Sequence, residues 1–378
     1  MKRPRFQYQL PKFEQPPLAG APEARFEPAT ADGVLPERFF STSNLPTYVK
    51  VGRSWSRPRL PRMDCVIVRE ADGSLVTMEP RKVKRGTAVA VGTAENGLEG
   101  IFVHGEGFLG GGHSANEFSF MQTAVSREKP VDYSVLAELL GEERLRGGKI
   151  MWVIGPALVH ARAREDMIWF IERGYCQALL GGNAVAVHDL EAAIFGTTLG
   201  MSSSGEGVEG GHALHMRAIN QIRSAGSIER AVAAGQVRGG IMHALVKHHV
   251  PYVLAGSIRD DGPLPEVLSD TLAAQDAMRS YTATATFAVF VATALHAIAV
   301  GNMLPAFVDA PTPDGVRPLT TICVDQTEFV VNKLRDRGTH QAYGVVTNAQ
   351  DFMHVLRFYV ERWEQAQAPT TATSSPAR

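Results

Sequence analysis

Three charged residues stand side by side after an apolar run, and their types suit amino-acid chemistry. Residues 251–265 read PYVLAGSIRDDGPLP and contain Arg259, Asp260 and Asp261. Adjacent carboxylates raise one another's pKa, which favours proton transfer near neutral pH by one of them. The other could hold ribose hydroxyls or an ammonium group, and the arginine could bind a substrate carboxylate. The alternative is a surface salt-bridge cluster that precedes a Gly-Pro turn.

A second stretch, residues 178–200, also begins with an apolar strand, which leads into a glycine turn and a helix-like segment. It reads ALLGGNAVAVHDLEAAIFGTTLG. Small residues at Gly182, Asn183 and Ala184 would let the backbone approach a bulky cofactor, and the Asn amide can both donate and accept. An ordinary turn that closes a buried strand is the alternative. His188 and Asp189 could be a base and its partner, or a pair that caps a helix.

Other candidates follow apolar segments further along the chain. Gly301, Asn302, Met303 and Leu304 end an apolar helix and could line a slot for adenine or nicotinamide. Asp325 ends the strand TTICVD, where an acid can hydrogen-bond ribose hydroxyls or cap the next helix.

Two glycine patterns match the dinucleotide-binding motif. Gly105, Gly107 and Gly110 follow a strand-like run and could form a phosphate loop or a flexible loop near the active site. The second pattern, at 205, 207 and 210, has no strand before it and is interpreted as chance. Neither HExxH nor CxxC spacing occurs, which disfavours a metal, and a GxSxG elbow is also absent.

The elements that must position these residues alternate in type. Short β-like runs fill residues 39–120 and predict a small β-rich domain. From residue 149 onward strands alternate with helices, which predicts a doubly wound, mainly parallel sheet with its ligand at the strand ends. We expect an extended or disordered arm over 1–35, a β-rich subdomain over 36–145, a Rossmann-like subdomain over 146–365 and a disordered tail over 366–378. The apolar run 287–300 is interpreted as a buried helix within a long helical region, 270–300.

Composition excludes several classes of protein. The 378 residues carry a formal net charge of −1, and 44% of them are hydrophobic. Without a basic face nucleic acid is an unexpected partner, and no apolar run is long enough to cross a membrane. The N-terminus lacks the apolar core of a signal peptide, and three widely spaced cysteines fit a reducing compartment, so we expect a cytoplasmic protein.

Taken together, these stretches resemble a known family. The segments GGNAVAVHDLEAAIFGTTLG, GGHALHMRAINQIRSAGSI, PYVLAGSIRDDGPLP and LHAIAVGNMLP resemble the NAD-dependent ornithine cyclodeaminase module at the C-terminus of bifunctional arginine dihydrolases. The module is also known as the lysine-ketoglutarate reductase/saccharopine dehydrogenase conserved region. STSNLPTYVKV, MDCVIV and VSREKP are similar to its N-terminal subdomain, so the resemblance covers about residues 39–353. The segments GEGFLGGGH and SSSGEGVEGG depart from the family pattern.

The resemblance implies a deoxyhypusine-synthase-like Rossmann subdomain, NAD as cofactor, and conversion of L-ornithine to L-proline and ammonia. It also implies a homo-oligomer. On this hypothesis Asp260 or Asp261 handles protons or the substrate amines, Arg259 binds the substrate carboxylate, and His160, at the end of a GPALVH strand, relays protons. The residues expected to hold NAD are Gly182, Asn183, Ala184, Asp261, Gly301, Asn302, Met303, Leu304 and Asp325.

Two other functions stay open at this point. One is an NAD-dependent cyclodeaminase or dehydrogenase that acts on lysine or another diamino acid. The other is a nucleotide-responsive binding module without catalysis. Proline formed from ornithine without net NADH would favour the ornithine cyclodeaminase over both alternatives.

Overall fold

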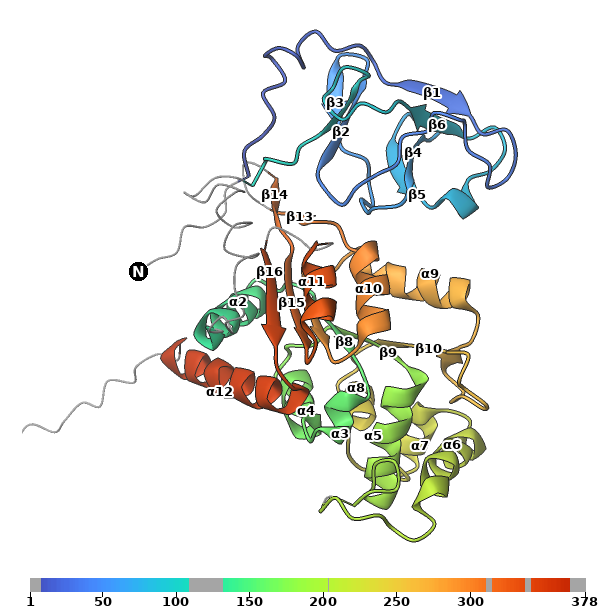
Figure 1. Cartoon of the computed structure of the whole chain (residues 1–378), viewed down its shortest axis with the longest axis vertical. Helices are drawn as coiled ribbons and strands as arrows, with labels where there is room; N and C mark the ends of the chain where they lie inside the picture. The colour runs from blue at the N-terminus through green and yellow to red at the C-terminus, as the bar shows by residue number, and fades with distance from the viewer. Residues whose placement is uncertain (1–7, 109–131, 203, 311–314, 337–340, 368–378) are drawn as a thin grey trace, which may run out of the picture.

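The computed structural model describes residues 8–108, 132–202, 204–310, 315–336 and 341–367. Within them the chain forms an N-terminal β domain and a C-terminal α/β domain (Figure 1). The expected tail lies almost entirely outside the described residues, as does Gly110 of the first glycine pattern.

Seven strands of the described chain form one parallel sheet in the order β11-β10-β9-β8-β12-β15-β16. Their bounds are β8 (Ile150–Ile154), β9 (Ala178–Gly182), β10 (Tyr252–Ala255), β11 (Val267–Leu268), β12 (Phe287–Val291), β15 (Thr320–Asp325) and β16 (Gln341–Val346). Apart from the edge strand β11, this is the order of a dinucleotide-binding Rossmann sheet. The predicted α/β fold is therefore confirmed.

Helices cover both faces of this sheet. One face packs against α2 (Tyr133–Leu145), α4 (Arg164–Glu172), α5 (Asn183–Phe195), α8 (Ile241–Lys247) and α12 (Ala349–Gln367). The other packs against α9 (Thr271–Thr282), α10 (Ala294–Met303) and α11 (Glu328–Asp336). Strand β8 shows why: Ile150, Trp152 and Ile154 face the first layer, and Met151 and Val153 face the second. Every residue of β8 is consequently buried and apolar.

Further helices complete the α/β domain. They are α3 (Ala157–His160), α6 (Leu214–Ala225), α7 (Ile228–Ala233) and the 3₁₀ turn η2 (Gly211–Ala213). A two-stranded antiparallel ribbon, β13 (Phe307–Asp309) with β14 (Val316–Pro318), lies between α10 and β15 in the chain. Figure 1 places this ribbon between the two domains.

The run 287–300 is not one buried helix, so that prediction was wrong. Residues Phe287–Val291 form the central strand β12, which pairs with β8 and β15, and α10 begins only at Ala294. The sequence FAVFV is rich in aromatic and β-branched residues, which pack well on a pleated sheet. An apolar run of this length does not by itself distinguish a buried strand from a buried helix.

The β domain contains two small antiparallel sheets and a 3₁₀ turn, η1 (Pro80–Lys82). One has the order β1-β6-β4-β5 and the other β3-β2-β7. Their bounds are β1 (Arg25–Pro28), β2 (Thr47–Val51), β3 (Ser54–Ser56), β4 (Val66–Arg69), β5 (Leu75–Met78), β6 (Ala88–Val91) and β7 (Ile101–Val103). Strand β1 belongs to the stretch expected to be an arm. Because it pairs with β6, residues 25–28 are ordered.

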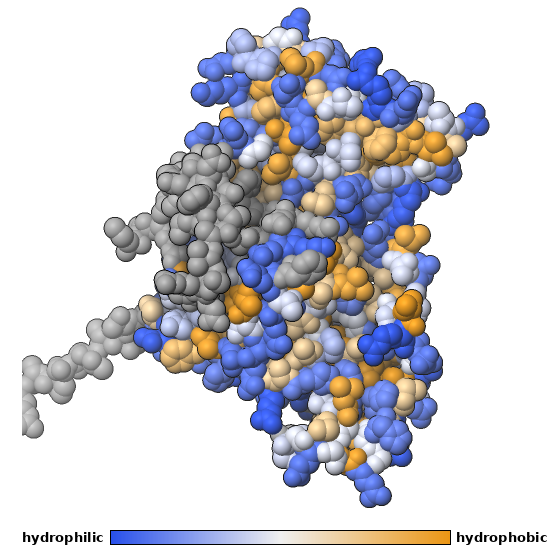
Figure 2. Space-filling model, in the orientation of Figure 1, coloured by the Kyte–Doolittle hydropathy of each residue, from blue (hydrophilic) through white to orange (hydrophobic). Residues whose placement is uncertain are grey.

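Buried charges join the two domains. The Glu79 carboxylate of the β domain lies 3.3 Å from Arg62 Nη1 and 3.0 Å from Arg279 Nη1 of α9. A backbone hydrogen bond of 2.8 Å from Ala306 N to Asn44 O adds to this interface. Elsewhere, hydrophilic and hydrophobic side chains are intermixed on the face shown in Figure 2.

Candidate active site

The strand order reverses between β8 and β12, and the carboxyl ends of these strands define the switch point at which such folds bind ligands. Gly155 follows β8 and Ala292 follows β12. A Cβ at Gly155 would lie 1.9 Å from Ala292 O, so only glycine fits there. Ala292 itself has φ of 54°, a strained value for a residue with a side chain. The two backbones therefore meet at close range, in an unusual conformation, at the expected ligand site.

The end of β9 lies next to this switch point and is shaped for close approach. Gly182 is the N-cap of α5 and makes no side-chain capping hydrogen bond, and Thr293, the N-cap of α10, makes none either. Uncapped helix N-termini leave backbone N–H groups that can bind phosphate oxygens. A Cβ at Gly182 would lie 2.8 Å from His296 Cε1. The glycine therefore lets the end of β9 pack against α10, and the open N–H groups of the two helices can bind a diphosphate.

Asn183 and Asp260 are brought together as the sequence predicts, but they contact each other. Asn183 Nδ2 donates to Asp260 Oδ1 at 3.1 Å, and Leu264 N donates to Asn183 Oδ1 at 3.1 Å. Asp260 Oδ2 accepts a hydrogen bond of 2.7 Å from Ser257 N. The Asn183 amide thus holds the loop formed by residues 256–264, named here the carboxylate loop. Whether it also contacts NAD stays a prediction.

Arg259 and Asp261 belong to the same loop and are exposed. Neither side chain makes a hydrogen bond or ion pair with any residue that the structure describes. Both can therefore meet a ligand at the carboxyl edge of the sheet. The structure does not place them in a surface salt-bridge cluster with the described residues, which was the alternative interpretation.

Residues 301–304 do not lie at this edge, contrary to the expected grouping with the tips of β9 and β10. Helix α10 begins beside the carboxyl end of β12 and runs back along the sheet for about 15 Å. Met303 and Leu304 are buried in the core. Their side chains are closed to a ligand in this structure, whereas a role for Gly301 and Asn302 remains a prediction.

Asp325 ends β15 as the sequence predicts, and Ala184 is the second residue of α5, just after β9. Asp325 Oδ1 accepts hydrogen bonds from Thr327 N at 2.9 Å and Thr327 Oγ1 at 2.8 Å. Asp325 therefore orders the turn before α11, whereas the capping of that helix, the alternative role considered for it, stays a prediction. A contact with ribose stays a prediction.

His160 and His188 form a pair behind this edge. His160 is the last residue of the short helix α3, not the end of a strand as expected, because Pro156 begins a helical turn. The centroids of the two rings lie 4.4 Å apart. Burial, and then the neighbouring His160, lower the pKa of His188 to about 4. Burial also lowers the pKa of His160.

Asp189 is not the partner of His188. Its carboxylate accepts hydrogen bonds from Ile241 N at 2.9 Å and Met242 N at 2.8 Å, and from Arg164 Nε at 2.6 Å. It therefore caps helix α8, so the capping interpretation was the better one, although the helix capped is a different one. The His188 ring instead faces Glu191, with Nδ1 3.6 Å from Oε2.

His296 is a candidate residue at this edge that sequence reasoning missed. It lies in the first turn of α10, beside Gly182 of β9, and burial lowers its pKa. A neutral imidazole at the carboxyl edge can accept or donate a proton. If the run 287–300 had been divided into a strand and a helix, His296 would have been placed just after a strand end and considered as a candidate.

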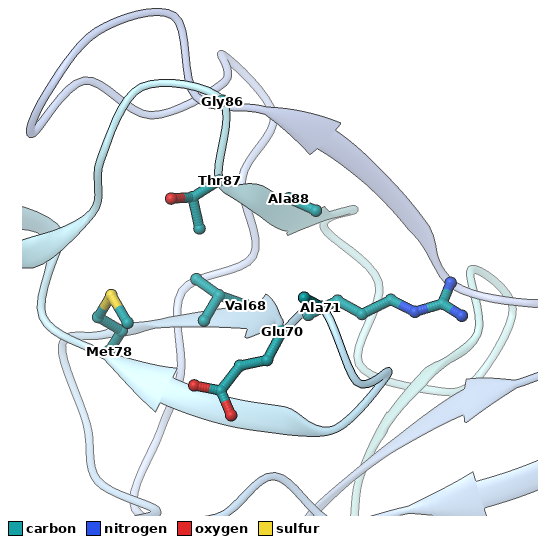
Figure 3. A pocket seen from close by; sticks show the side chains of 8 residues that line it. Val68, Glu70, Ala71, Met78, Gly86, Thr87 and Ala88 are labelled. Carbon is teal, nitrogen blue, oxygen red and sulfur yellow. The ribbon is translucent and has the colours of Figure 1, made fainter.

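Two hollows among the described residues lie away from the switch point. A groove of about 600 Å³ crosses the β domain (Figure 3), where Val68, Glu70, Met78 and Thr87 line it. Another, of about 300 Å³, lies at the amino edge of the sheet and includes Lys149 and Tyr281. Neither has convergent charged groups near the switch point.

The second glycine pattern forms a surface loop. Met201 pairs with Gly207 in an isolated bridge, and Gly205 and Gly210 have positive φ. In the described part of the chain, no cluster of three or more His, Cys, Asp or Glu residues could hold a metal ion. The same residues contain no helix long and apolar enough to span a bilayer.

Comparison with known proteins explains this arrangement. Residues 134–356 match the family model for the arginine dihydrolase ArgZ-like C-terminal Rossmann fold, and residues 46–135 match the model for its first region. An ornithine cyclodeaminase from Methanopyrus kandleri is 43% identical over 338 residues, which span 88% of this chain and 77% of the relative. The chain belongs to the ornithine cyclodeaminase family of the arginine dihydrolase C-terminal type.

Other members of this family include bifunctional enzymes and solved structures. The bifunctional arginine dihydrolase/ornithine cyclodeaminase AgrE of Nostoc is 38% identical over 88% of this chain and 46% of its own length. A putative LOR/SDH protein of Methanococcus maripaludis superposes with a TM-score of 0.81 at 39% identity, over 91% of this chain and 99% of that one. AgrE in its ternary complex with ornithine and NAD⁺ superposes with a TM-score of 0.56 at 34% identity, over 92% and 47%.

Proposed function

We propose that this chain is an NAD-dependent ornithine cyclodeaminase, which converts L-ornithine to L-proline and ammonia. The observation that carries the proposal is the match at 43% identity over most of both chains to an ornithine cyclodeaminase. The solved complex of AgrE with ornithine and NAD⁺ supports the same cofactor and substrate for the shared module. The chain extends over both family regions, residues 46–135 and 134–356.

The carboxyl edge suits NAD on structural grounds. At Gly155 and Gly182 the lack of a side chain lets the strand ends pack closely against Ala292 and His296, and the uncapped N-termini of α5 and α10 offer donors to a diphosphate. The chemistry that NAD supplies is transient acceptance of the hydride from the substrate Cα and its return. Asp325 and the backbone of residues 182–184 are the groups we propose to hold it.

The carboxylate loop suits the substrate. A diamino acid presents one carboxylate and two ammonium groups, and the loop presents one guanidinium and one carboxylate, on Arg259 and Asp261, that make no hydrogen bond or ion pair with side chains in the described part of the chain. A guanidinium binds a carboxylate through two parallel hydrogen bonds. Asp261 can then accept a proton from a substrate amine. His296 and, behind it, the pair His160 and His188 are further groups that can hold a proton.

A substrate panel tests the proposed activity. The protein is incubated with a substoichiometric amount of NAD⁺ and with L-ornithine, L-lysine or 2,4-diaminobutanoate, and the products are identified by mass. We expect equal amounts of proline and ammonia from ornithine and no net NADH. Net NADH accumulation would indicate a plain dehydrogenase. NAD binding without any change in the amino acids would indicate a binding module.

Asp261→Asn tests the proposed role of the loop. We expect kcat to fall at least tenfold, because the amide cannot accept the proton. Full turnover together with unchanged NAD affinity would show that Asp261 has no part in the site. Asp276→Asn, a carboxylate on α9 that pairs with Arg81 of the β domain, is the control and should turn over at the wild-type rate.

Three properties belong to the same proposal. We propose that the enzyme acts in the cytoplasm, in proline formation, and as a homo-oligomer. Light scattering that gives the mass of a monomer at micromolar concentration would overturn the oligomer.

A further inference from the structure

We propose that Asn183 and Asp260 are positioning residues, which lock the carboxylate loop, and that Arg259 and Asp261 are the residues of that loop that meet the substrate. This inference rests on the proposed function and divides the roles within the Asp-Asp pair. It also changes the expected role of Asn183 from a cofactor contact to a support.

The contacts of Asp260 carry the first step. Each of its carboxylate oxygens accepts a hydrogen bond from the protein, Oδ1 from Asn183 Nδ2 and Oδ2 from Ser257 N. Asp260 N also donates to Ser257 O at 3.1 Å, which closes a tight turn. Both oxygens of its carboxylate are thus bound within the protein, one by α5 and one by the loop, as expected for a residue that positions the loop.

The contacts of Asn183 carry the second step. The residue is 7% exposed, and both ends of its amide are used: Nδ2 holds Asp260, and Oδ1 holds the backbone of Leu264. One buried amide therefore ties two points of the carboxylate loop to the start of α5. The Asn amide suits this position because it donates to a carboxylate with its nitrogen and accepts from an N–H with its oxygen.

The far end of the loop is held separately. Arg223 Nε of α6 donates to Pro263 O at 3.1 Å, and Glu266 accepts a hydrogen bond from Ile228 N at the start of α7. With both ends fixed, the loop presents Ile258, Arg259 and Asp261 to solvent in a defined geometry. Fixing the substrate-binding groups before the substrate arrives reduces the entropy lost on binding.

An exchange of the two side chains tests this division of roles. In Asn183→Asp a carboxylate faces Asp260 without an intervening proton, and in Asp260→Asn the Asn183 amide loses its charged acceptor. We expect each single variant to lower kcat/KM for ornithine at least tenfold. In the double variant N183D/D260N, the amide moved to position 260 can donate to the carboxylate moved to position 183. That carboxylate can still accept from Leu264 N, and the net charge is unchanged. We expect the kcat/KM of the double variant to return to within threefold of wild type.

Hydrogen exchange provides a readout that does not depend on turnover. The amides of Ser257 and Leu264 should exchange at least tenfold faster in each single variant and at the wild-type rate in the double variant. If the wild-type protein did not cyclise ornithine, this pattern would still test the lock. The failure of the proposed function and the failure of this inference are therefore distinguishable.

A matched pair elsewhere in the chain serves as control. Asn348 Nδ2 donates to Asp351 Oδ2 at 2.7 Å, and Asp351 N donates to Asn348 Oδ1 at 2.8 Å, at the start of α12. Asp351→Asn and its exchange with Asn348 should leave kcat/KM within twofold of wild type. A folded N183D/D260N variant that stays as impaired as Asp260→Asn would overturn the inference, because it would show that the Asp260 carboxylate acts on the substrate itself. Weaker NAD binding in Asn183→Asp that the exchange does not restore would overturn it as well.

Discussion

The imidazole rings of His160 and His188 lie against each other, with centroids 4.4 Å apart and ring planes inclined at 59°. The first ring comes from the helix that follows β8 and the second from the helix that follows β9. His188 Nδ1 is buried and makes no hydrogen bond with the described residues. Burial disfavours a charged imidazole and lowers the pKa of both histidines, so both rings are neutral at physiological pH.

The pH dependence of stability should reveal His188. Its pKa is about 4 in the folded protein, against an ordinary value of 6.5. Between pH 6.5 and pH 4 the unfolded chain binds the proton more tightly, so the free energy of unfolding falls as the pH falls. Over this range we expect the free energy of unfolding of the wild-type protein to fall by about 2 kcal/mol more than that of His188→Gln, after allowance for solvent screening.

Urea unfolding midpoints measured from pH 7.5 to pH 4 test this expectation. The wild-type curve should fall relative to that of His188→Gln below pH 6.5 and run parallel to it above. The exposed His212 is the control, and His212→Gln should follow wild type throughout. Parallel curves for wild type and His188→Gln across the whole range would contradict the account.

Gly155→Ala should damage the switch point. Its Cβ would meet Ala292 O at 1.9 Å, so the end of β8 or of β12 must move. We expect a loss of about 2–3 kcal/mol in the free energy of unfolding and weaker NAD binding. Gly239 has open space around its position and serves as the control for Gly→Ala. Calorimetric titration with NAD⁺ measures the effect, and wild-type affinity in a stable Gly155→Ala variant would refute it.

Glu79→Gln should weaken the junction between the two domains. The Glu79, Arg62 and Arg279 side chains are 9%, 7% and 11% exposed, so the substitution leaves two buried guanidinium groups without their carboxylate. Loss of one partner of a buried ion pair costs about 3–5 kcal/mol. Thermal unfolding and limited proteolysis between the domains measure the loss.

An exposed ion pair gives the contrast for this prediction. Asp32 and Lys84 are 63% and 73% exposed, and Asp32→Asn should change stability by less than about 1 kcal/mol. If Asp32→Asn and Glu79→Gln lowered the free energy of unfolding equally, burial of the Glu79 cluster would add nothing to its effect on stability.

Much of the fold was accessible from the sequence because the patterns were local. The runs TYVKV and TTICVD form β2 and β15 as expected, and Gly181-Gly182 closes β9 before α5. The run 287–300 was misjudged because a buried strand followed by a buried helix has no amphipathic period. Because of that error, residues 301–304 were expected beside the strand ends, although they lie at the far end of α10. For the same reason His296, in the first turn of α10, was not considered as a candidate.

The site could be located but not resolved from the sequence. Spacing places Asn183 and Asp260 at two strand ends, but only the structure shows that they bond to each other across the loop. In the same way, Asp189 next to His188 looks like a catalytic partner, and its actual contacts, the N–H groups of α8, lie more than 50 residues away in the chain. Such long-range pairs carry no local sequence signal.

The most direct test of the account follows a deuterium label on the substrate Cα. L-Ornithine deuterated at Cα is incubated with the protein and a substoichiometric amount of NAD⁺, and the product is examined by NMR and mass spectrometry. The account predicts L-proline that retains deuterium at Cα, an equal amount of ammonia and no net NADH. Proline that has lost the deuterium to solvent, or a 2-oxo acid formed together with stoichiometric deuterated NADH, would contradict it.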